Sequence, residues 1–236
     1  MQFIYIITGL LICFGVEYSS KFTFKINQRY LKSFPPNFLM QIYFAICSLI
    51  LMHLFRYELK FNIKYSNVFE ILFQSFFLFF ISFFILKVIF DIIEKKYPAE
   101  EVKKEENATF SPPNQKIFLF MVMCINPITE ELLYRGFLLN HILAGNYLLS
   151  NNIFMNLSLP ILISGLYFGL THLSLLKGGM NKYSVYFIVI GGVIVGSACG
   201  YYYIRFDSFT AAIIVHAMAN ITIGATLSFK EKLMKP

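Results

Sequence analysis

The chain has 236 residues, of which 57% are hydrophobic and 14% are charged, whereas a typical soluble domain has about 25% charged residues. A soluble domain of this length could not bury that much apolar surface, so the composition excludes a cytosolic globular domain, a disordered chain and a disulfide-rich secreted scaffold. The net charge of +7 does not indicate nucleic-acid binding, because the basic residues lie in short segments between apolar runs. We therefore expect an integral, multi-pass membrane protein whose environment is a lipid bilayer, which is the cell membrane if the source is prokaryotic.

Seven apolar runs follow one another along the chain, each long enough or nearly long enough to cross a hydrocarbon core of about 30 Å as a helix. They cover residues 2–16, 37–55, 68–93, 117–143, 154–176, 184–203 and 209–229. These runs predict an all-α fold, a polytopic membrane helix bundle of about seven transmembrane helices, with a range of six to eight. The first run is short, but it lacks the basic start and the cleavage site of a signal peptide, so we interpret it as an anchor.

Charge and composition divide the chain into four parts. Residues 94–116 carry many charges of both signs and contain Pro112–Pro113, which predicts a charged cytoplasmic linker. Residues 1–93 before it are expected to form accessory transmembrane spans, and no polar cluster among them indicates a site. Residues 117–229 form the second group of spans, and residues 230–236 form a cytoplasmic tail, because the basic residues favour a C-terminus on the inner side.

The fourth run contains ionisable side chains near its middle. Such a side chain at bilayer depth costs about 2.5–3.5 kcal/mol, so it persists where it pairs or acts. Glu131 and Arg135 are four residues apart and can pair on one helix face. Glu130 points about 100° away from Glu131, which leaves its carboxylate free to face a cavity as a general base. Pro127, one turn earlier, frees a backbone carbonyl. The structural alternative is a buried ion pair that only fixes packing.

Polar pairs at the same spacing occur in the fifth and seventh runs. Phe168 and His172 share one helix face, and His172 could act as a base or as a metal ligand. His216 and Asn220 also share a face, and both could donate hydrogen bonds to a developing oxyanion. A satisfied core histidine and an interhelical polar contact are the alternatives for these two runs. Three polar faces at similar depth on C-terminal spans favour one shared site.

These three faces resemble, in order and in placement, the motifs of the CPBP family, which groups CAAX-type prenyl endopeptidases with bacteriocin-processing enzymes. The motifs are Glu130-Glu131-x-x-x-Arg135, Phe168-x-x-x-His172 and His216-x-x-x-Asn220. The resemblance covers residues 117–229, roughly half of the chain, and implies a catalytic core there. It implies an intramembrane endopeptidase that hydrolyses a peptide bond of a membrane-associated or lipidated protein or peptide.

The resemblance also assigns roles. It implies that Glu130 and His172 activate water, and that His216 and Asn220 form an oxyanion hole. Glu131 and Arg135 would support the site, and Phe168 would shape it. The expected partner is a protein or peptide substrate, such as a prenylated protein or a leader peptide. The functional alternatives are a non-catalytic membrane immunity or scaffold protein of the same family and a proton-coupled transporter.

One Glu and two His are also the ligand set of many catalytic zinc sites. A zinc ion held by Glu130, His172 and His216 is therefore the alternative to a site without metal. The chain contains no HExxH motif, and Asn220 beside His216 fits an oxyanion hole better than a ligand shell. We expect no metal and no other cofactor.

Overall fold

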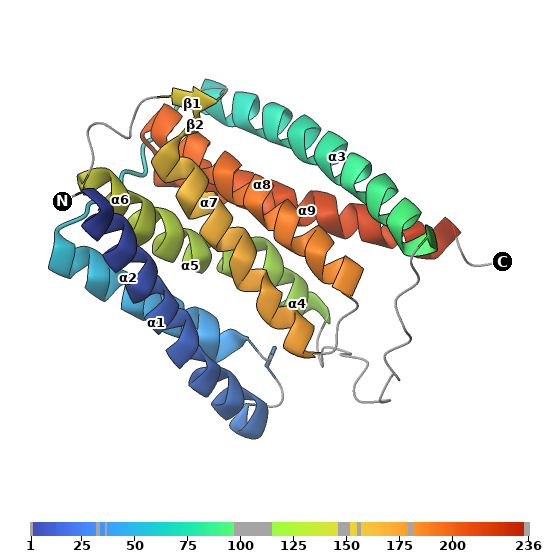
Figure 1. Cartoon of the computed structure of the whole chain (residues 1–236), viewed down its shortest axis with the longest axis horizontal. Coiled ribbons are helices and arrows are strands. Elements are labelled where there is room, and N and C mark those ends of the chain that lie inside the picture. The colour runs from blue at the N-terminus through green and yellow to red at the C-terminus, as the bar shows by residue number, and fades with distance from the viewer. Residues whose placement is uncertain are drawn as a thin grey trace.

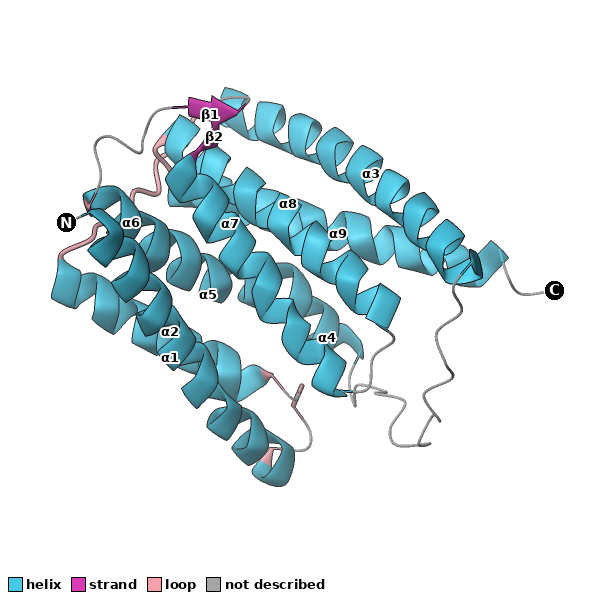
Figure 2. Cartoon of the chain, viewed as in Figure 1, coloured by secondary structure: helices cyan, strands magenta, loops and turns pink. Residues whose placement is uncertain are grey.

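A computed structural model of the chain describes residues 2–31, 34–35, 37–96, 115–145, 152–154, 157–178 and 182–233. Within these ranges the fold is an all-α bundle with one short hairpin (Figures 1 and 2). The all-α class predicted from the apolar runs is confirmed. The predicted linker lies almost entirely outside the described residues, since only its ends are included.

The helices follow the seven apolar runs. The first three are α1 (Gln2–Tyr30), α2 (Phe38–Phe55) and α3 (Tyr65–Lys96). The fourth run is a helical segment of α4 (Gln115–Phe120), η1 (Met121–Ile125), α5 (Asn126–Glu131), η2 (Leu132–Leu139) and α6 (Asn140–Ala144), in which η1 and η2 are π-helical. A hairpin of β1 (Asn152–Phe154) and β2 (Leu157–Ser158) follows, and then α7 (Leu159–Thr171), the 3-10 helix η4 (His172–Gly178), α8 (Lys182–Phe206) and α9 (Phe209–Leu233).

Two helix boundaries differ from the predicted runs. The first run was expected over residues 2–16, but α1 ends at Tyr30 because residues 17–30 contain no proline or glycine to interrupt it. The fifth run was expected from residue 154, but α7 begins at Leu159 with Pro160 in its first turn, and the preceding residues form the hairpin. Both differences lie at the ends of apolar runs, where hydropathy alone does not determine where a helix begins or ends.

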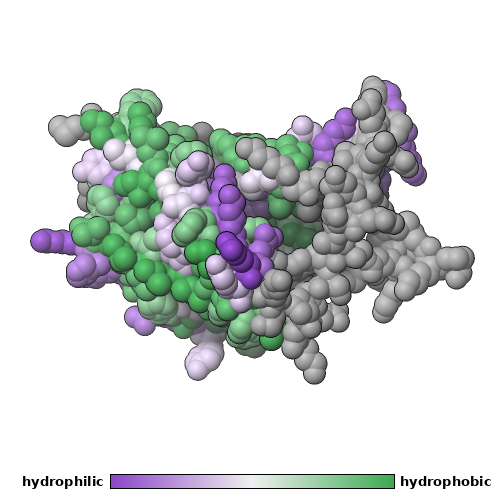
Figure 3. All heavy atoms as spheres, turned by 90° about the horizontal axis from the view of Figure 1, so that it is seen from below, coloured by the Kyte–Doolittle hydropathy of each residue, from purple (hydrophilic) through white to green (hydrophobic). Residues whose placement is uncertain are grey.

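Within the described residues, five helices are long and apolar enough, by length and composition, to cross a membrane. They are α1, α2, α3, α7 with η4, and α8. The expected number of seven is reached with α9, whose apolar part covers Phe209–Ile223, and with the interrupted helix from α4 to α6. Many large hydrophobic side chains on these helices are exposed, as expected for a surface that faces lipid. Figure 3 shows hydrophobic side chains over the left part of one face, next to a hydrophilic strip near its centre.

Helices α7 and α8 lie side by side at very close approach (Figure 1). A Cβ atom on Gly196 would lie 2.8 Å from the Cα of Gly165, and one on Gly192 would lie 3.0 Å from the Cα of Gly169. Such distances exclude larger side chains, so the small residues permit this helix pair. The close approach also brings the carbonyl of Gly196 to Arg135, which donates to it from Nη2.

The interrupted fourth helix lies at the centre of the bundle. All eight residues of η2 are buried, and this segment packs against α1, α2, α7, α8 and α9. A helix that is covered on all sides belongs to a core and not to a lipid-facing surface. Arg135 therefore lies in an enclosed part of the molecule, and Glu130 and Glu131 directly precede this segment at the end of α5.

Candidate active site

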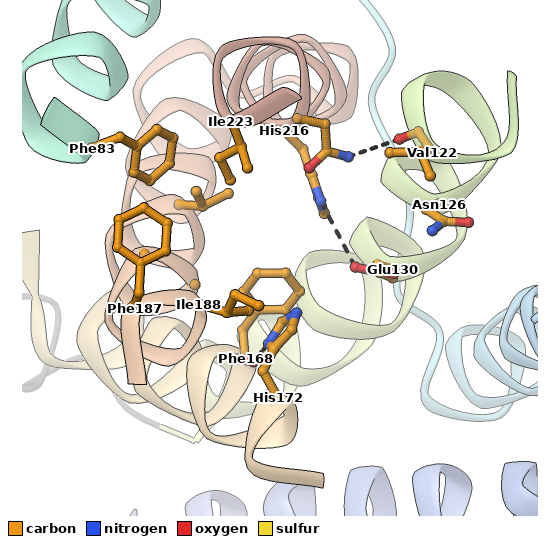
Figure 4. Close-up of a pocket in the computed structure, with 14 residues that line it drawn as sticks. Phe83, Val122, Asn126, Glu130, Phe168, His172, Phe187, Ile188, His216 and Ile223 are labelled. Carbon is orange, nitrogen blue, oxygen red and sulfur yellow. Dashed lines mark hydrogen bonds and ion pairs between the residues drawn. The ribbon is translucent and has the colours of Figure 1, made fainter. Parts of the chain in front are cut away.

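Motif residues of three separate spans line one pocket of about 170 Å³, to which α3 and α8 also contribute (Figure 4). Glu130 of α5 and His172 at the end of α7 line it, and so do His216 and Asn220 of α9. Phe168 lines it as well. The structure thus gathers the four predicted catalytic residues around one space, and their catalytic roles stay predictions.

A backbone carbonyl left unpaired by Pro127 explains how α9 is bonded to the fourth helix at this pocket. At the end of η1, the N–H of Asn126 donates to the carbonyl of Met121, five residues earlier. In the same register the carbonyl of Val122 would pair with residue 127, but Pro127 has no N–H. Nδ2 of Asn220 donates to this carbonyl at 2.8 Å. The carbonyl freed by Pro127 therefore positions Asn220, whose second Nδ2 hydrogen is not used in this bond.

Glu131 and Arg135 form a fully buried ion pair next to the pocket. Nε of Arg135 lies 3.1 Å from Oε2 of Glu131, and Nη1 donates to Oε1 at 3.1 Å. Both side chains are 0% exposed. The pairing predicted from the four-residue spacing is confirmed. Because the guanidinium also donates to Gly196, it ties α5 and η2 to α8.

His216 connects the two adjacent carboxylates. Its Nδ1 lies 2.7 Å from Oε1 of Glu131, and its Nε2 lies 3.8 Å from Oε2 of Glu130 (Figure 4). A carboxylate only accepts, so Nδ1 carries a hydrogen in the bond to Glu131. A proton on Nε2 as well would balance two carboxylates against one guanidinium and one imidazolium. It would also make Nε2 a hydrogen-bond donor beside the pocket.

His172, like His216, carries a hydrogen on Nδ1. Its Nδ1 lies 3.1 Å from the carbonyl oxygen of Phe168, which can only accept, so Nδ1 carries the hydrogen. Nε2 of the neutral ring then has a lone pair, which is what a base or a water-orienting group needs. The ring of Phe168 stands edge-on to both His172 and His216, with centroids 5.2 and 5.5 Å away. Phe168 therefore fixes both imidazole planes.

Glu130 differs from its neighbour Glu131 in environment. Its side chain is 18% exposed, against 0% for Glu131, and it faces the pocket as the predicted 100° rotation requires. Oε1 of Glu130 accepts a hydrogen bond from Nε2 of Gln41 at 3.3 Å. The guanidinium of Arg135 is engaged with Glu131 and Gly196 and does not compensate the charge of Glu130. Its carboxylate is thus the one available for proton transfer.

Sequence reasoning missed the polar residues that the first two helices contribute. Gln41 of α2 contacts Glu130, and Glu17 of α1 accepts a 2.8 Å hydrogen bond from the hydroxyl of Tyr134. The sequence shows no polar cluster in residues 1–93, and in the structure single polar residues of these helices nevertheless contact the segment that carries the first motif. The only signal was a single polar residue within an apolar run, and such a residue has no spacing partner that reveals its target.

The described residues fit a metal ion poorly. Among them, the three donors that come within 4.8 Å of one another belong to Glu131, Cys199 and His216. Both oxygens of Glu131 already contact the guanidinium of Arg135, whose charge would repel a cation there. The alternative zinc set of Glu130, His172 and His216 does not gather its donor atoms within that distance.

Residues 112–222 match the family model of the Type II CAAX prenyl endopeptidase Rce1-like proteins. No curated protein and no solved structure matches the chain significantly. The matched region contains all three motifs, and it leaves out α1, α2 and α3. Together with the apolar helices, the match identifies an integral membrane protein. The match over residues 112–222 therefore supports the CPBP and CAAX protease family, a family of membrane proteases that act on proteins or peptides.

Proposed function

We propose that the protein is an intramembrane endopeptidase that hydrolyses a peptide bond with water activated by Glu130 and His172. The observation that carries the proposal is the convergence of Glu130, His172, His216 and Asn220 on one pocket. Glu130 and His172 supply acceptors for water, and the other two supply hydrogen-bond donors, which are the two kinds of group that peptide hydrolysis needs. The match to a protease family supports the same reaction.

The reaction runs in two steps. Glu130 removes one proton from water, and Nε2 of His172 accepts a hydrogen bond from the other O–H of the same water. The water oxygen then bonds to the carbonyl carbon of the substrate. The resulting oxyanion accepts hydrogen bonds from protonated Nε2 of His216 and from the second Nδ2 hydrogen of Asn220. The C–N bond then breaks, and Glu130 returns its proton to the leaving nitrogen. The products are a carboxylic acid and an amine, and Glu130 recovers its initial state.

The supporting residues act through the catalytic ones. Glu131 holds Nδ1 of His216 at 2.7 Å, and Arg135 holds Glu131 through both of its oxygens. This chain of contacts fixes the imidazole before substrate arrives, so that no reorganisation is needed when the oxyanion forms. We propose that the site works without metal, because the protein groups alone supply the base and the oxyanion donors.

The substrate class follows from the walls of the pocket. Across from Glu130, the pocket is lined by apolar side chains, and these include Phe83, Phe187, Ile188 and Ile223 (Figure 4). Such a wall suits an apolar group next to the scissile bond, either a large side chain or an attached lipid. We propose a membrane-associated or lipidated protein or peptide as the substrate.

The test compares peptides and new N-termini in cells that carry the wild-type protein or Glu130→Gln at equal expression. We expect a set of fragments that is present with the wild type and lost with the variant. Glu58→Gln, in the exposed loop after α2, is the matched control and should keep the fragments. Identical profiles for wild type and Glu130→Gln would contradict the proposal and favour a non-catalytic binding protein.

A further inference from the structure

The carboxylate of Glu130 receives a hydrogen bond from outside the region that matches the family. Gln41 lies in the first turn of α2 and is only 1% exposed. Its Nε2 donates to Oε1 of Glu130 at 3.3 Å, and its Oε1 accepts from the hydroxyl of Thr129. Both polar ends of this buried amide therefore bind neighbouring residues of α5. The side chain of Gln41 thus links α2 by two hydrogen bonds to the segment that carries Glu130, the proposed general base.

The neighbours of Gln41 determine which way its amide faces. An ionised Glu130 can only accept, so the NH₂ group of Gln41 must face it. The hydroxyl of Thr129 can donate, and Thr129 is itself 7% exposed. A buried amide without partners would cost free energy, so the satisfied orientation is strongly preferred. The amide therefore holds one oxygen of the Glu130 carboxylate in a defined position.

The other oxygen of the carboxylate is the one on the side of His216. Oε2 of Glu130 lies 3.8 Å from Nε2 of His216, and both residues line the pocket. Gln41 does not line the pocket, so it is placed to act on the carboxylate from behind. Fixing Oε1 limits rotation of the carboxylate and keeps Oε2 where water can enter.

We propose that Gln41 is a positioning residue for the endopeptidase reaction, and this inference rests on the proposed function. It holds the Glu130 carboxylate in the orientation that takes a proton from water. Residues 1–93 are then more than accessory spans, because α2 completes a site whose motifs all lie in the C-terminal part of the chain.

The first variant is Gln41→Leu in the full-length purified protein, assayed on the peptide identified by the comparison with Glu130→Gln. Leucine removes both hydrogen bonds and keeps an apolar side chain of similar size. We expect kcat to fall about 10- to 100-fold, because a small misplacement of a catalytic group can cost that much. KM should change less than about twofold, because Gln41 does not contact the substrate space.

Asn27→Leu is the matched control. Asn27 is also a buried amide with 1% exposure, and it too is bonded at both ends. Its Nδ2 donates to the carbonyl of Pro35, and its Oδ1 accepts from the N–H of Leu39, so its partners join α1 to the start of α2. We expect Asn27→Leu to lower stability while the folded protein keeps its kcat. An equal loss of kcat in both variants would overturn the inference, since any lost buried amide would then suffice.

Thr129→Val provides an independent test that does not alter α2. It removes the hydroxyl that orients Gln41 and keeps the shape of the side chain. We expect a several-fold loss of kcat, and the double variant with Gln41→Leu should lose no more than Gln41→Leu alone, because both act through one chain of hydrogen bonds. Losses that multiply in the double variant would overturn the inference. If Gln41→Leu does not insert, an unchanged kcat in Thr129→Val would overturn it.

The outcomes separate this inference from the proposed function. Cleavage that depends on Glu130 but is unaffected by Gln41→Leu would refute the positioning role of Gln41. The proposal that the protein is an endopeptidase would not be affected by that result. Equal profiles for wild type and Glu130→Gln would refute the endopeptidase, and the role of Gln41 with it.

Discussion

Arg135→Met is expected to destabilise the folded protein strongly. Arg135 is 0% exposed and contacts both oxygens of Glu131 and the carbonyl of Gly196. Methionine fills much of the space but leaves Glu131 as an unpaired buried charge, which costs about 2.5–3.5 kcal/mol at bilayer depth. Breaking a buried ion pair by removing one partner costs about 3–5 kcal/mol. We expect a loss of about 3–5 kcal/mol in the free energy of unfolding, which lowers the folded-to-unfolded ratio roughly 100- to 5,000-fold.

The measurement is chemical unfolding of purified protein in micelles, followed by far-UV circular dichroism. The matched control is the double variant Glu131→Leu/Arg135→Met, which removes both charges. Replacement of a buried ion pair by apolar residues is often neutral, so the double variant should recover most of the lost stability. It should not recover activity, because His216 loses the acceptor that lies 2.7 Å from its Nδ1.

Three results would contradict this reasoning. Equal free energies of unfolding for the wild type and Arg135→Met would show that the guanidinium does not compensate a buried charge. A double variant less stable than Arg135→Met would show that Glu131 stabilises the fold without its partner. Recovery of both stability and cleavage in the double variant would contradict the supporting role assigned to Glu131.

Three further predictions concern the pocket. His172→Gln should lower kcat by about 10²- to 10⁴-fold. The free energy of unfolding should change little, because Nδ1 of His172 bonds only within its own helical segment. A fully active His172→Gln variant would show that His172 does not activate water. Asn220→Ala should lower the kcat of folded protein by about 10²- to 10³-fold at nearly constant KM, as loss of an oxyanion donor does, whereas a change confined to KM would indicate substrate binding. Treatment with 1,10-phenanthroline should leave cleavage intact, and a loss restored by zinc would overturn the metal-free proposal.

The parts of the site that sequence could predict depend on short-range spacing. Residues four apart on a helix must share a face, so the pair of Glu131 and Arg135 followed from the sequence. Adjacent residues must diverge by about 100°, so the separate direction of Glu130 followed as well. The missing N–H of Pro127 is likewise a property of one residue, and its effect on a nearby carbonyl did not depend on the fold.

The parts that sequence could not predict depend on contacts between distant segments. Gln41 and Glu130 are 89 residues apart, and nothing in the apolar run around Gln41 indicates its partner. The two π-helical segments within the fourth run also escaped prediction, because hydropathy does not distinguish π from α register. The contacts between the glycines of α7 and α8 are also long-range, because which glycine faces which is determined by the pairing of the helices.

Two neighbouring glutamates lie in different environments, and this difference supports the separate roles that we propose for them. Glu131 is fully enclosed and has its charge compensated by Arg135, so it can support His216 but has no access to water. Glu130 is 18% exposed at the pocket and is held by a neutral amide, which orients a carboxylate without neutralising it. A guanidinium at the position of Gln41 would bind Glu130 more tightly and would compete with its proton transfer. The guanidinium therefore contacts the supporting carboxylate, whereas the proposed base has the amide of Gln41 and, at 3.8 Å, Nε2 of His216. This difference in partners makes the Glu-Glu pair chemically asymmetric.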